Sequence, residues 1–194
     1  MLELPDVTLI ALTNKDFEGH KKALEKSSEG IKWGGRKIIW DENITSIDDW
    51  NYKIIYELHN YVQTDYAFLF HADGYVIRPN CWNWDWLTYD FIGAPWPLPQ
   101  DNFSYRTPKG EVIRVGNSVS LRSKRILKLP SELGLLWKIY YDNTNEDGFL
   151  TCHNRDRLIQ EGIKFAGLDV AKYFSKEHSI PENEGIETFA FHSL

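Results

Sequence analysis

Two side chains that bind metals or phosphates follow an apolar strand in the first half of the chain. Residues 64–70 have the short, aromatic-rich pattern of a buried strand, and His71 and Asp73 come before Gly74 ends it. Strand side chains alternate between faces, so we expect His71 and Asp73 to point the same way. Open α/β folds bind their ligands at this end of a strand. The alternative is a strand that ends in a turn with a solvated Asp.

A second stretch combines small residues with polar donors. Gly116, Asn117 and Ser118 let the backbone approach a ligand closely and offer N–H and hydroxyl groups. The alternation of Val119 and Leu121 then returns to strand character. Taken alone, the pattern is also that of a tight turn before an edge strand.

Two further stretches carry acids and an imidazole. In residues 142–150, Thr144 is followed three positions later by Asp147, which predicts a helix N-cap with Glu146 and Asp147 in the first turn. Residues 189–194 are apolar and strand-like and contain His192. A lone histidine there is usually a surface residue, so this segment carries no function by itself.

Alternating strands and helices must position these groups. Residues 7–13, 37–40 and 64–70 read as strands, and residues 17–26 and 48–62 as the helices between them. Such alternation implies right-handed crossovers and a mainly parallel, Rossmann-like sheet flanked by helices. The dinucleotide-binding Gly-x-Gly-x-x-Gly loop and the Walker loop are both absent, which excludes those two classes.

The second half of the chain is less regular. Residues 89–97 predict a short strand running into a proline-bounded loop, and residues 98–110 predict a mobile surface loop. Trp82, Trp84 and Trp86 suit either a helix or a strand, and we expect them to pack in or beside the core. We expect one domain over residues 1–194, with a nucleotide-binding half to about residue 80 and an acceptor half from about residue 81.

Composition limits the classes of partner. The formal net charge of −6 disfavours a nucleic-acid partner, because phosphate-backbone binding needs a basic surface. No apolar run reaches the ~20 residues that span a bilayer, and the N-terminus is a poor secretion signal, so a cytoplasmic protein is the expectation. Peripheral membrane association stays open. Cys81 and Cys152 have no metal-ligand spacing, and one disulfide between them also stays open.

The four stretches resemble a known family in one linear order. His71-Ala72-Asp73 resembles the Asp-x-Asp motif of GT-A-type glycosyltransferases, and residues 116–118 resemble their glycine-rich loop. Residues 145–147 resemble their x-Glu-Asp motif, and His192 their C-terminal metal-binding histidine. The motifs most closely resemble those of a poorly characterised GT-A-like family. That family has Gln-x-Asp, Tyr-Asp-Tyr-Ile-Gly-Ala-Pro-Trp, Gly-Asn-Gly-Gly-Phe-Ser-Leu-Arg, Glu-Asp and a closing Phe-His. The matching residues here are 89–96, 116–122, 146–147 and 191–192.

The resemblance implies a GT-A-like fold and a metal-dependent glycosyltransferase. Its donor would be a UDP- or GDP-linked sugar, and its acceptor a glycan or lipid-linked hydroxyl, as in polysaccharide biosynthesis. Mn²⁺ or Mg²⁺ would be held by Asp73 and His192, with His71 as a further ligand or a donor to phosphate. Asp147 would be the general base, and Glu146 a second catalytic-site acid with a structural or acceptor role.

The resemblance also suggests binding residues. Gly116, Asn117 and Ser118 would line the donor sugar. The first two strand ends would hold the nucleoside through Thr13, Asn14 and Asp41, with Tyr52 stacking beside them. Trp96 would offer its ring to the acceptor, the alternative being a buried loop anchor.

The chain departs from the family pattern at two places, and the first departure, together with the compact length, favours an alternative function. His71 stands where the first acid is expected, and Ser118-Val119 stand where the family has Gly-Gly. The alternative is a non-catalytic carbohydrate- or nucleotide-binding module on the same fold.

Overall fold

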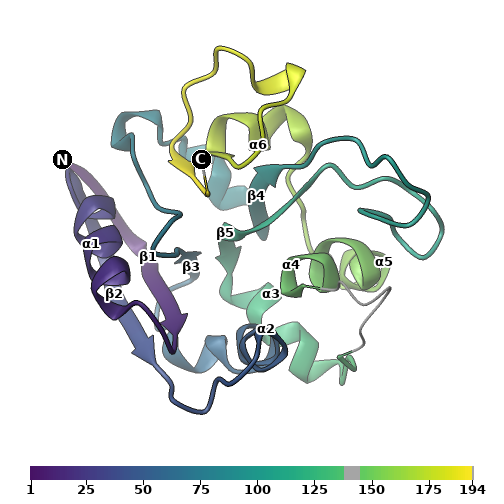
Figure 1. Ribbon diagram of the computed structural model, residues 1–194, viewed down its shortest axis with the longest axis horizontal. Coiled ribbons are helices and arrows are strands. Elements are labelled where there is room, and N and C mark those ends of the chain that lie inside the picture. Colours follow the sequence, from purple (N-terminus) through teal and green to yellow (C-terminus); the bar gives the residue numbers. More distant parts are fainter. Residues whose placement is uncertain (138–144, 194) are drawn as a thin grey trace.

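A five-stranded sheet with helices on both faces organises the chain (Figure 1). This computed structural model describes residues 1–137 and 145–193. The helices and strands, in chain order, are β1 (Leu2–Thr13), α1 (Phe17–Ser27), β2 (Ile31–Trp40), α2 (Ile47–Tyr56), β3 (Tyr66–Leu69), β4 (Phe91–Pro95), β5 (Val115–Ser123), α3 (Lys124–Glu132), α4 (Glu146–Gly148), α5 (Arg155–Gln160), α6 (Leu168–Phe174), β6 (Ser175–Lys176) and β7 (Ala190–Phe191).

The sheet is mixed, which corrects the expectation of a mainly parallel one. Its order is β2-β1-β3-β5-β4; β1 pairs in parallel with β2 and β3, whereas β5 pairs antiparallel with both β3 and β4. The physical reason lies between β4 and β5, where residues 96–114 contain no helix. Parallel neighbours need a crossover, whereas a helix-free connection returns the chain as an antiparallel strand.

Strand alternation builds a core on each face of the sheet. In β1, Leu9 and Ala11 face one cluster while Ile10 and Leu12 face the other. The first cluster is covered by α1 and α6, and the second by α2, α3 and the turn between α2 and β3. Figure 1 shows α1 and α6 apart from α2 and α3, in agreement with this division. The two cores hold the strand ends rigidly, which any site built there requires.

The helix predicted over residues 48–62 is shorter in the structure. It begins at Ile47, where the Ser46 side chain accepts a hydrogen bond from the Asp49 backbone N–H, and it ends at Tyr56. A separate 3₁₀ turn, Leu58–Tyr61, follows. The apolar positions that suggested a longer helix are nevertheless buried. The first helix begins as predicted, with Asp16 as its cap.

The tryptophan patch divides between core and surface. Trp86 is buried and packs against Phe174 and Phe189, with ring centroids 5.1 and 5.6 Å away. Trp82 is partly buried against Trp86. Trp84 is 57% exposed, so the prediction of core packing is wrong for this residue. Trp84 begins a 3₁₀ helix, Trp84–Thr88, and keeps an edge contact with the Trp82 ring, whose centroid is 6.1 Å away.

Three other expectations can be compared with the structure. Residues 98–110 carry exposed apolar side chains at Leu98 and Phe103, in line with a surface loop; the mobility of this loop stays a prediction. Cys81 and Cys152 are both free thiols. Among residues 1–137 and 145–193, no helix is both long and apolar enough to cross a bilayer.

Candidate functional site

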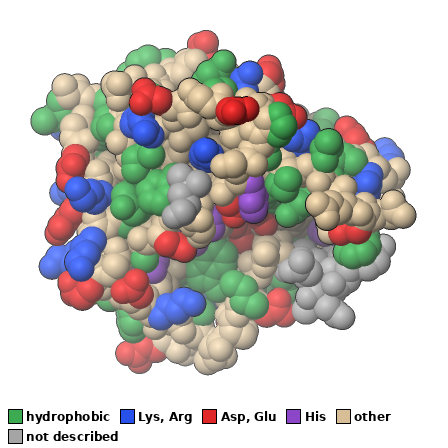
Figure 2. All heavy atoms as spheres, turned by 45° about the horizontal axis from the view of Figure 1, so that its top comes forward, with side chains coloured by type: hydrophobic (Ala, Val, Ile, Leu, Met, Phe, Trp, Pro, Cys, Tyr) green, Lys and Arg blue, Asp and Glu red, His purple; other side chains and the backbone are tan. Residues whose placement is uncertain are grey.

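A cleft of about 770 Å³ opens at the carboxyl ends of β1 and β3. Its walls come from the β1–α1 connection, the start of α2, the β3 turn, β5, the start of α4 and the C-terminal segment. Figure 2 shows histidine and acidic side chains gathered around a hollow on one face of the molecule. The polar and aromatic residues at its wall that the following argument uses are Thr13, Asn14, Lys15, Asp16, His20, Trp50, His71, Asp73, Asn117, Ser118, Glu146, Asp147, Glu177 and His192.

A tight turn at the end of β3 presents Asp73 to this cleft. The His71 backbone N–H donates to the Gly74 carbonyl at 2.7 Å, closing the turn. A Cβ on Gly74 would lie 2.5 Å from Val119 and 2.7 Å from the His192 ring. Glycine at this position therefore lets the C-terminal segment pack against the turn.

The structure brings Asp73 and His192 together, as the sequence predicted. The His192 Nε2 atom lies 3.7 Å from an Asp73 carboxylate oxygen, and the Ser193 hydroxyl donates to the other oxygen at 2.9 Å. Burial alone would raise the pKa of Asp73, but the Ser193 hydrogen bond and the neighbouring His192 outweigh it and lower the pKa. The Asp73 side chain is 67% exposed, so its carboxylate is available to a ligand.

The Nδ1 edge of the His192 ring contacts two residues. Its Nδ1 atom lies 3.4 Å from a Glu177 carboxylate oxygen and 3.1 Å from the Asn117 side-chain amide. Burial opposes ionisation of Glu177, but hydrogen bonds with His192 and Asn117 lower its pKa. An imidazole whose Nδ1 is held by a carboxylate has its Nε2 directed at the opposite side, the usual arrangement of a metal-ligating histidine.

His71 lines the cleft as a partly buried, neutral ring. Its Nε2 atom lies 2.9 Å from the Ser118 hydroxyl, and its ring stacks on His192 with centroids 5.3 Å apart. On the other side lies the Trp50 ring, at 5.4 Å. Burial, followed by the nearby His192, lowers the pKa of His71 to about 3. Because Ser118 occupies Nε2, the contacts favour a packing and hydrogen-bonding role over metal ligation.

Asp147 is a partly buried carboxylate between two backbone donors. One oxygen accepts from the Asn117 N–H at 2.8 Å and the other from the Gly148 N–H at 2.7 Å. Burial, followed by the charge of Glu146, raises the pKa of Asp147 to about 7 despite these hydrogen bonds. A carboxylate with this pKa exchanges a proton readily at neutral pH.

Glu146 is tied to the protein beneath the cleft. Its carboxylate contacts the Arg122 guanidinium at 2.6 and 3.0 Å, and both side chains are fully buried. The Asn51 side chain accepts from the Glu146 backbone N–H at 3.0 Å. These contacts favour the structural role that the sequence left open for Glu146. The predicted helix cap at Thr144 lies outside the described residues; Asn145 is the residue before α4.

Asn117 joins His192 to Asp147. Its φ of 85° is left-handed, although it lies inside β5, at an irregularity opposite Gly93. Asparagine tolerates this conformation better than most residues. Its backbone N–H binds Asp147, its amide nitrogen reaches His192, and its side-chain oxygen accepts from the Val119 N–H. The predicted turn before an edge strand is thus wrong: β5 is an interior strand with a local distortion.

Trp96 is a buried anchor and not an exposed acceptor platform. It is 5% exposed, and its ring stacks on Tyr105 with centroids 4.6 Å apart. A Cβ on Gly116 would lie 1.9 Å from the Trp96 ring, so this glycine serves packing against the indole. The alternative named for Trp96 is therefore the one that the structure shows.

Two of the predicted nucleoside contacts also lie elsewhere. Asp41 binds Lys53 at 2.7 Å, and Tyr52 is half exposed and packs on Tyr56. Neither residue is part of the cleft wall as the structure describes it. Tyr52 faces away because it is two positions after Trp50 on α2, about half a helical turn. Thr13 and Asn14 do line the cleft.

Sequence reasoning missed several cleft residues, among them Glu177, Trp50 and His20. Glu177 follows β6 and belongs to no motif, so nothing in the sequence marked it. Trp50 and His20 lie near the starts of α2 and α1, and the Trp50 indole N–H donates to the Leu12 carbonyl at 2.7 Å. The sequence could have indicated Trp50 and His20, because residues near the start of a helix that follows a parallel strand lie beside the carboxyl end of that strand.

The donor set is compatible with one cation. The 3.7 Å between Nε2 of His192 and an oxygen of Asp73 is short enough for both atoms to contact one ion. Within the described residues, no group of three or more His, Cys, Asp and Glu side chains is arranged to hold a metal. Ligand oxygens and water would therefore have to complete the coordination. Lys15 is the single Lys or Arg among the described wall residues, against five carboxylates.

Comparisons with known proteins give a family without a function. A family described as "Protein of unknown function (DUF5672)" matches residues 41–192. The match spans Asp73, Asn117, Asp147, Glu177 and His192. No curated protein matches the chain.

Proposed function

We propose that this chain, which belongs to the DUF5672 family, is a metal-dependent glycosyltransferase that moves a sugar from a nucleotide-sugar to a hydroxyl acceptor. The observation that carries the proposal is the convergence of Asp73, His192 and Asp147 in one cleft. The parallel β2-β1-β3 half followed by an antiparallel β5 supports a GT-A-like variant of the α/β fold.

The charge of the cleft supports a cation-assisted diphosphate ligand. Carboxylates dominate the wall, so a diphosphate alone would be repelled. Asp73 and His192 would hold Mn²⁺ or Mg²⁺, with Glu177 orienting the imidazole. Such an ion, when bound, stabilises the negative charge that develops on a diphosphate leaving group.

The remaining chemistry belongs to Asp147. In the transfer, an acceptor oxygen bonds to the anomeric carbon while the bond from that carbon to the diphosphate oxygen breaks. The electron pair leaves with the diphosphate, and the hydroxyl proton passes to the Asp147 carboxylate. Its pKa of about 7 suits a base that must be ionised before reaction and protonated afterwards. The donor sugar would lie along Asn117 and Ser118, and the nucleoside along Thr13, Asn14 and Trp50.

Binding is tested first by thermal stabilisation. UDP or GDP should raise the melting temperature in the presence of Mn²⁺ and leave it unchanged with a chelator. Asp73→Ala should abolish this stabilisation. Asp6→Ala is the matched control, because Asp6 is exposed in the first half of β1, away from the strand end that lines the cleft. Unchanged nucleotide affinity in Asp73→Ala would remove Asp73 from the site.

Turnover is tested by release of nucleoside diphosphate from a panel of nucleotide-sugars. Asp147→Asn keeps one oxygen as a hydrogen-bond acceptor and cannot act as a base, so binding should persist and release should stop. In the wild type, kcat/KM should rise with pH to a plateau above about pH 7, because the base is active only when ionised.

A binding module is the second candidate, favoured by one observation. His71 replaces the first acid of the motif and is tied to Ser118, leaving fewer protein ligands for the ion. Mn²⁺-dependent nucleotide binding with no release from any donor, at any pH, would support the module and contradict the enzyme.

A further inference from the structure

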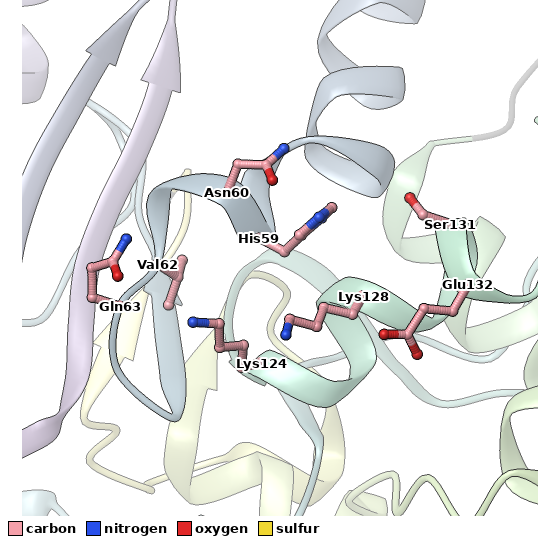
Figure 3. A pocket seen from close by; sticks show the side chains of 8 residues that line it. All are labelled: His59, Asn60, Val62, Gln63, Lys124, Lys128, Ser131 and Glu132. Atoms are coloured by element: carbon pink, nitrogen blue, oxygen red, sulfur yellow. The ribbon is translucent and has the colours of Figure 1, made fainter.

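A second pocket, of about 410 Å³, lies near the amino end of β3, whereas the cleft lies near the carboxyl end of this strand. It is formed by the 3₁₀ turn before β3 and by α3, which starts where β5 ends beside the first residue of β3. Figure 3 shows its wall, which we call the lysine pocket: His59, Asn60, Val62, Gln63, Lys124, Lys128, Ser131 and Glu132.

Two lysines of this pocket have no anionic partner within the part of the chain that the structure describes. Lys124 and Lys128 are one helical turn apart on α3, and Figure 3 shows their side chains extending in the same direction. Within the described residues, neither ammonium group forms an ion pair. Like charges at this spacing repel each other, and an anion between them would relieve the repulsion.

Neutral donors surround the lysines. Asn60 and Gln63 carry amide groups, and the buried Nδ1 atom of His59 has no hydrogen-bond partner among the described residues. Burial, followed by the charge of Lys128, lowers the pKa of His59, so its ring is neutral and offers one N–H. An oxyanion can accept hydrogen bonds from the two amide groups and from both lysines, whereas the lysines repel a cation.

Glu132 adds a negatively charged hydrogen-bond acceptor to the lysine pocket. It lies one turn beyond Lys128 on α3 yet forms no ion pair with it in the described structure. A carboxylate accepts hydrogen bonds from hydroxyl groups and repels a second anion. One part of the pocket wall is therefore cationic, and another part accepts hydrogen bonds.

We propose that the lysine pocket binds the phosphate group of a polyol phosphate ester, with the phosphate at Lys124 and Lys128 and the hydroxyl groups at Glu132. Asn60 and Gln63 donate to the remaining phosphate oxygens. The site is independent of the cleft and of the transfer reaction proposed for it. Soluble phosphate esters and phosphoglycerol lipid headgroups share this chemistry.

Glycerol 3-phosphate is the soluble probe for this site. In an NMR titration of the ¹⁵N-labelled chain with a chelator present, saturable shifts should be confined to residues 58–63 and 124–132. Lys124→Gln/Lys128→Gln should weaken binding at least about tenfold. Lys21→Gln/Lys22→Gln is the control, because it removes the same charge from exposed positions of α1. Glycerol without phosphate should produce no shifts.

Vesicles distinguish the two sources of the phosphate. Co-sedimentation with phosphatidylglycerol vesicles but not phosphatidylcholine vesicles, lost in Lys124→Gln/Lys128→Gln, would identify a lipid headgroup; saturation by glycerol 3-phosphate without vesicle binding would identify a soluble ester. The proposal is overturned if neither probe binds below about 10 mM phosphate groups. It is also overturned if the control pair weakens binding as much as the pocket pair, since diffuse charge would then explain it. Equal melting temperatures of the variants and the wild type establish that the fold is intact.

Discussion

The cleft and the lysine pocket lie at opposite ends of β3, and their polar groups are held in different ways. In the cleft, the Asp147 carboxylate lies between two backbone donors and the His192 ring between Asp73 and Glu177. In the lysine pocket, the ammonium groups of Lys124 and Lys128 extend from one helix without partners among the described residues. The polar groups of the cleft are therefore preorganised, whereas the charged groups of the lysine pocket are adaptable and screened by solvent.

The largest expected change in unfolding free energy is at the ion pair of Arg122 with Glu146, beneath the cleft. Arg122→Met leaves the Glu146 carboxylate buried without its cation, and we expect it to cost about 3–5 kcal/mol of unfolding free energy. Urea denaturation measures this change. Arg157→Met, which breaks an exposed ion pair with Glu161, should cost no more than about 1 kcal/mol. Arg122→Met/Glu146→Leu should recover most of the loss. Equal costs for the two single variants would show that this ion pair is not preorganised.

The two edges should also differ in pH dependence. The folded-state pKa of His71 is about 3 against an ordinary value of 6.5, so below pH 6.5 the unfolded chain takes up a proton that the folded chain refuses. His71 therefore contributes stability that is present above pH 6.5 and lost as the pH falls toward 3. His71→Gln should make this decline shallower, by up to about 1.4 kcal/mol per pH unit.

His59→Gln is the matched comparison in the lysine pocket. The pKa of His59 is lowered as well, but less strongly than that of His71, so the change should have the same sign and a smaller size. The raised pKa of Asp147 acts in the opposite direction and is common to both variants. Denaturation midpoints between about pH 4 and pH 7 measure the slopes. A steeper decline in His71→Gln than in the wild type would contradict the assignment of a neutral His71.

The smallest effect is expected at the lysines. Lys128→Gln removes the repulsion with Lys124 and should raise the unfolding free energy by about 0.2–0.5 kcal/mol at low salt, an advantage that fades as salt is added. Paired denaturation curves at low and high salt measure it. A destabilised variant would show that Lys128 already has a partner and would remove the basis for an unneutralised pocket.

Local sequence patterns predicted the elements better than their assembly. The cap of α1, the strand before His71 and the strand before Trp96 follow from periodicity and turn chemistry, whereas the cap of α2, Ser46, was not predicted. The antiparallel insertion of β5 does not, because it depends on which edge of β3 a distant strand reaches. The one available sign was the absence of a helical pattern between β4 and β5.

Motif order located part of the cleft, and burial decided the rest. Asp73, His192 and Asp147 were found because each belongs to a motif. Glu177 belongs to none, and its proximity to His192 arises only from the pairing of β6 with β7. The enclosure of Trp96 and the ion pair of Glu146 with Arg122 depend on packing between segments far apart in the chain, which residue types do not specify.

The return of β7 to the β3 turn has a consequence for the timing of assembly. The Ser193 backbone N–H donates to the Asp73 carbonyl, and the His192 N–H to the Lys176 carbonyl. All five strands of the sheet precede residue 124 in the chain, so the sheet can form before this segment docks, but the cleft then lacks one wall. The cleft is complete only when this segment docks, and a ligand that bridges Asp73 and His192 would hold the docked segment in place.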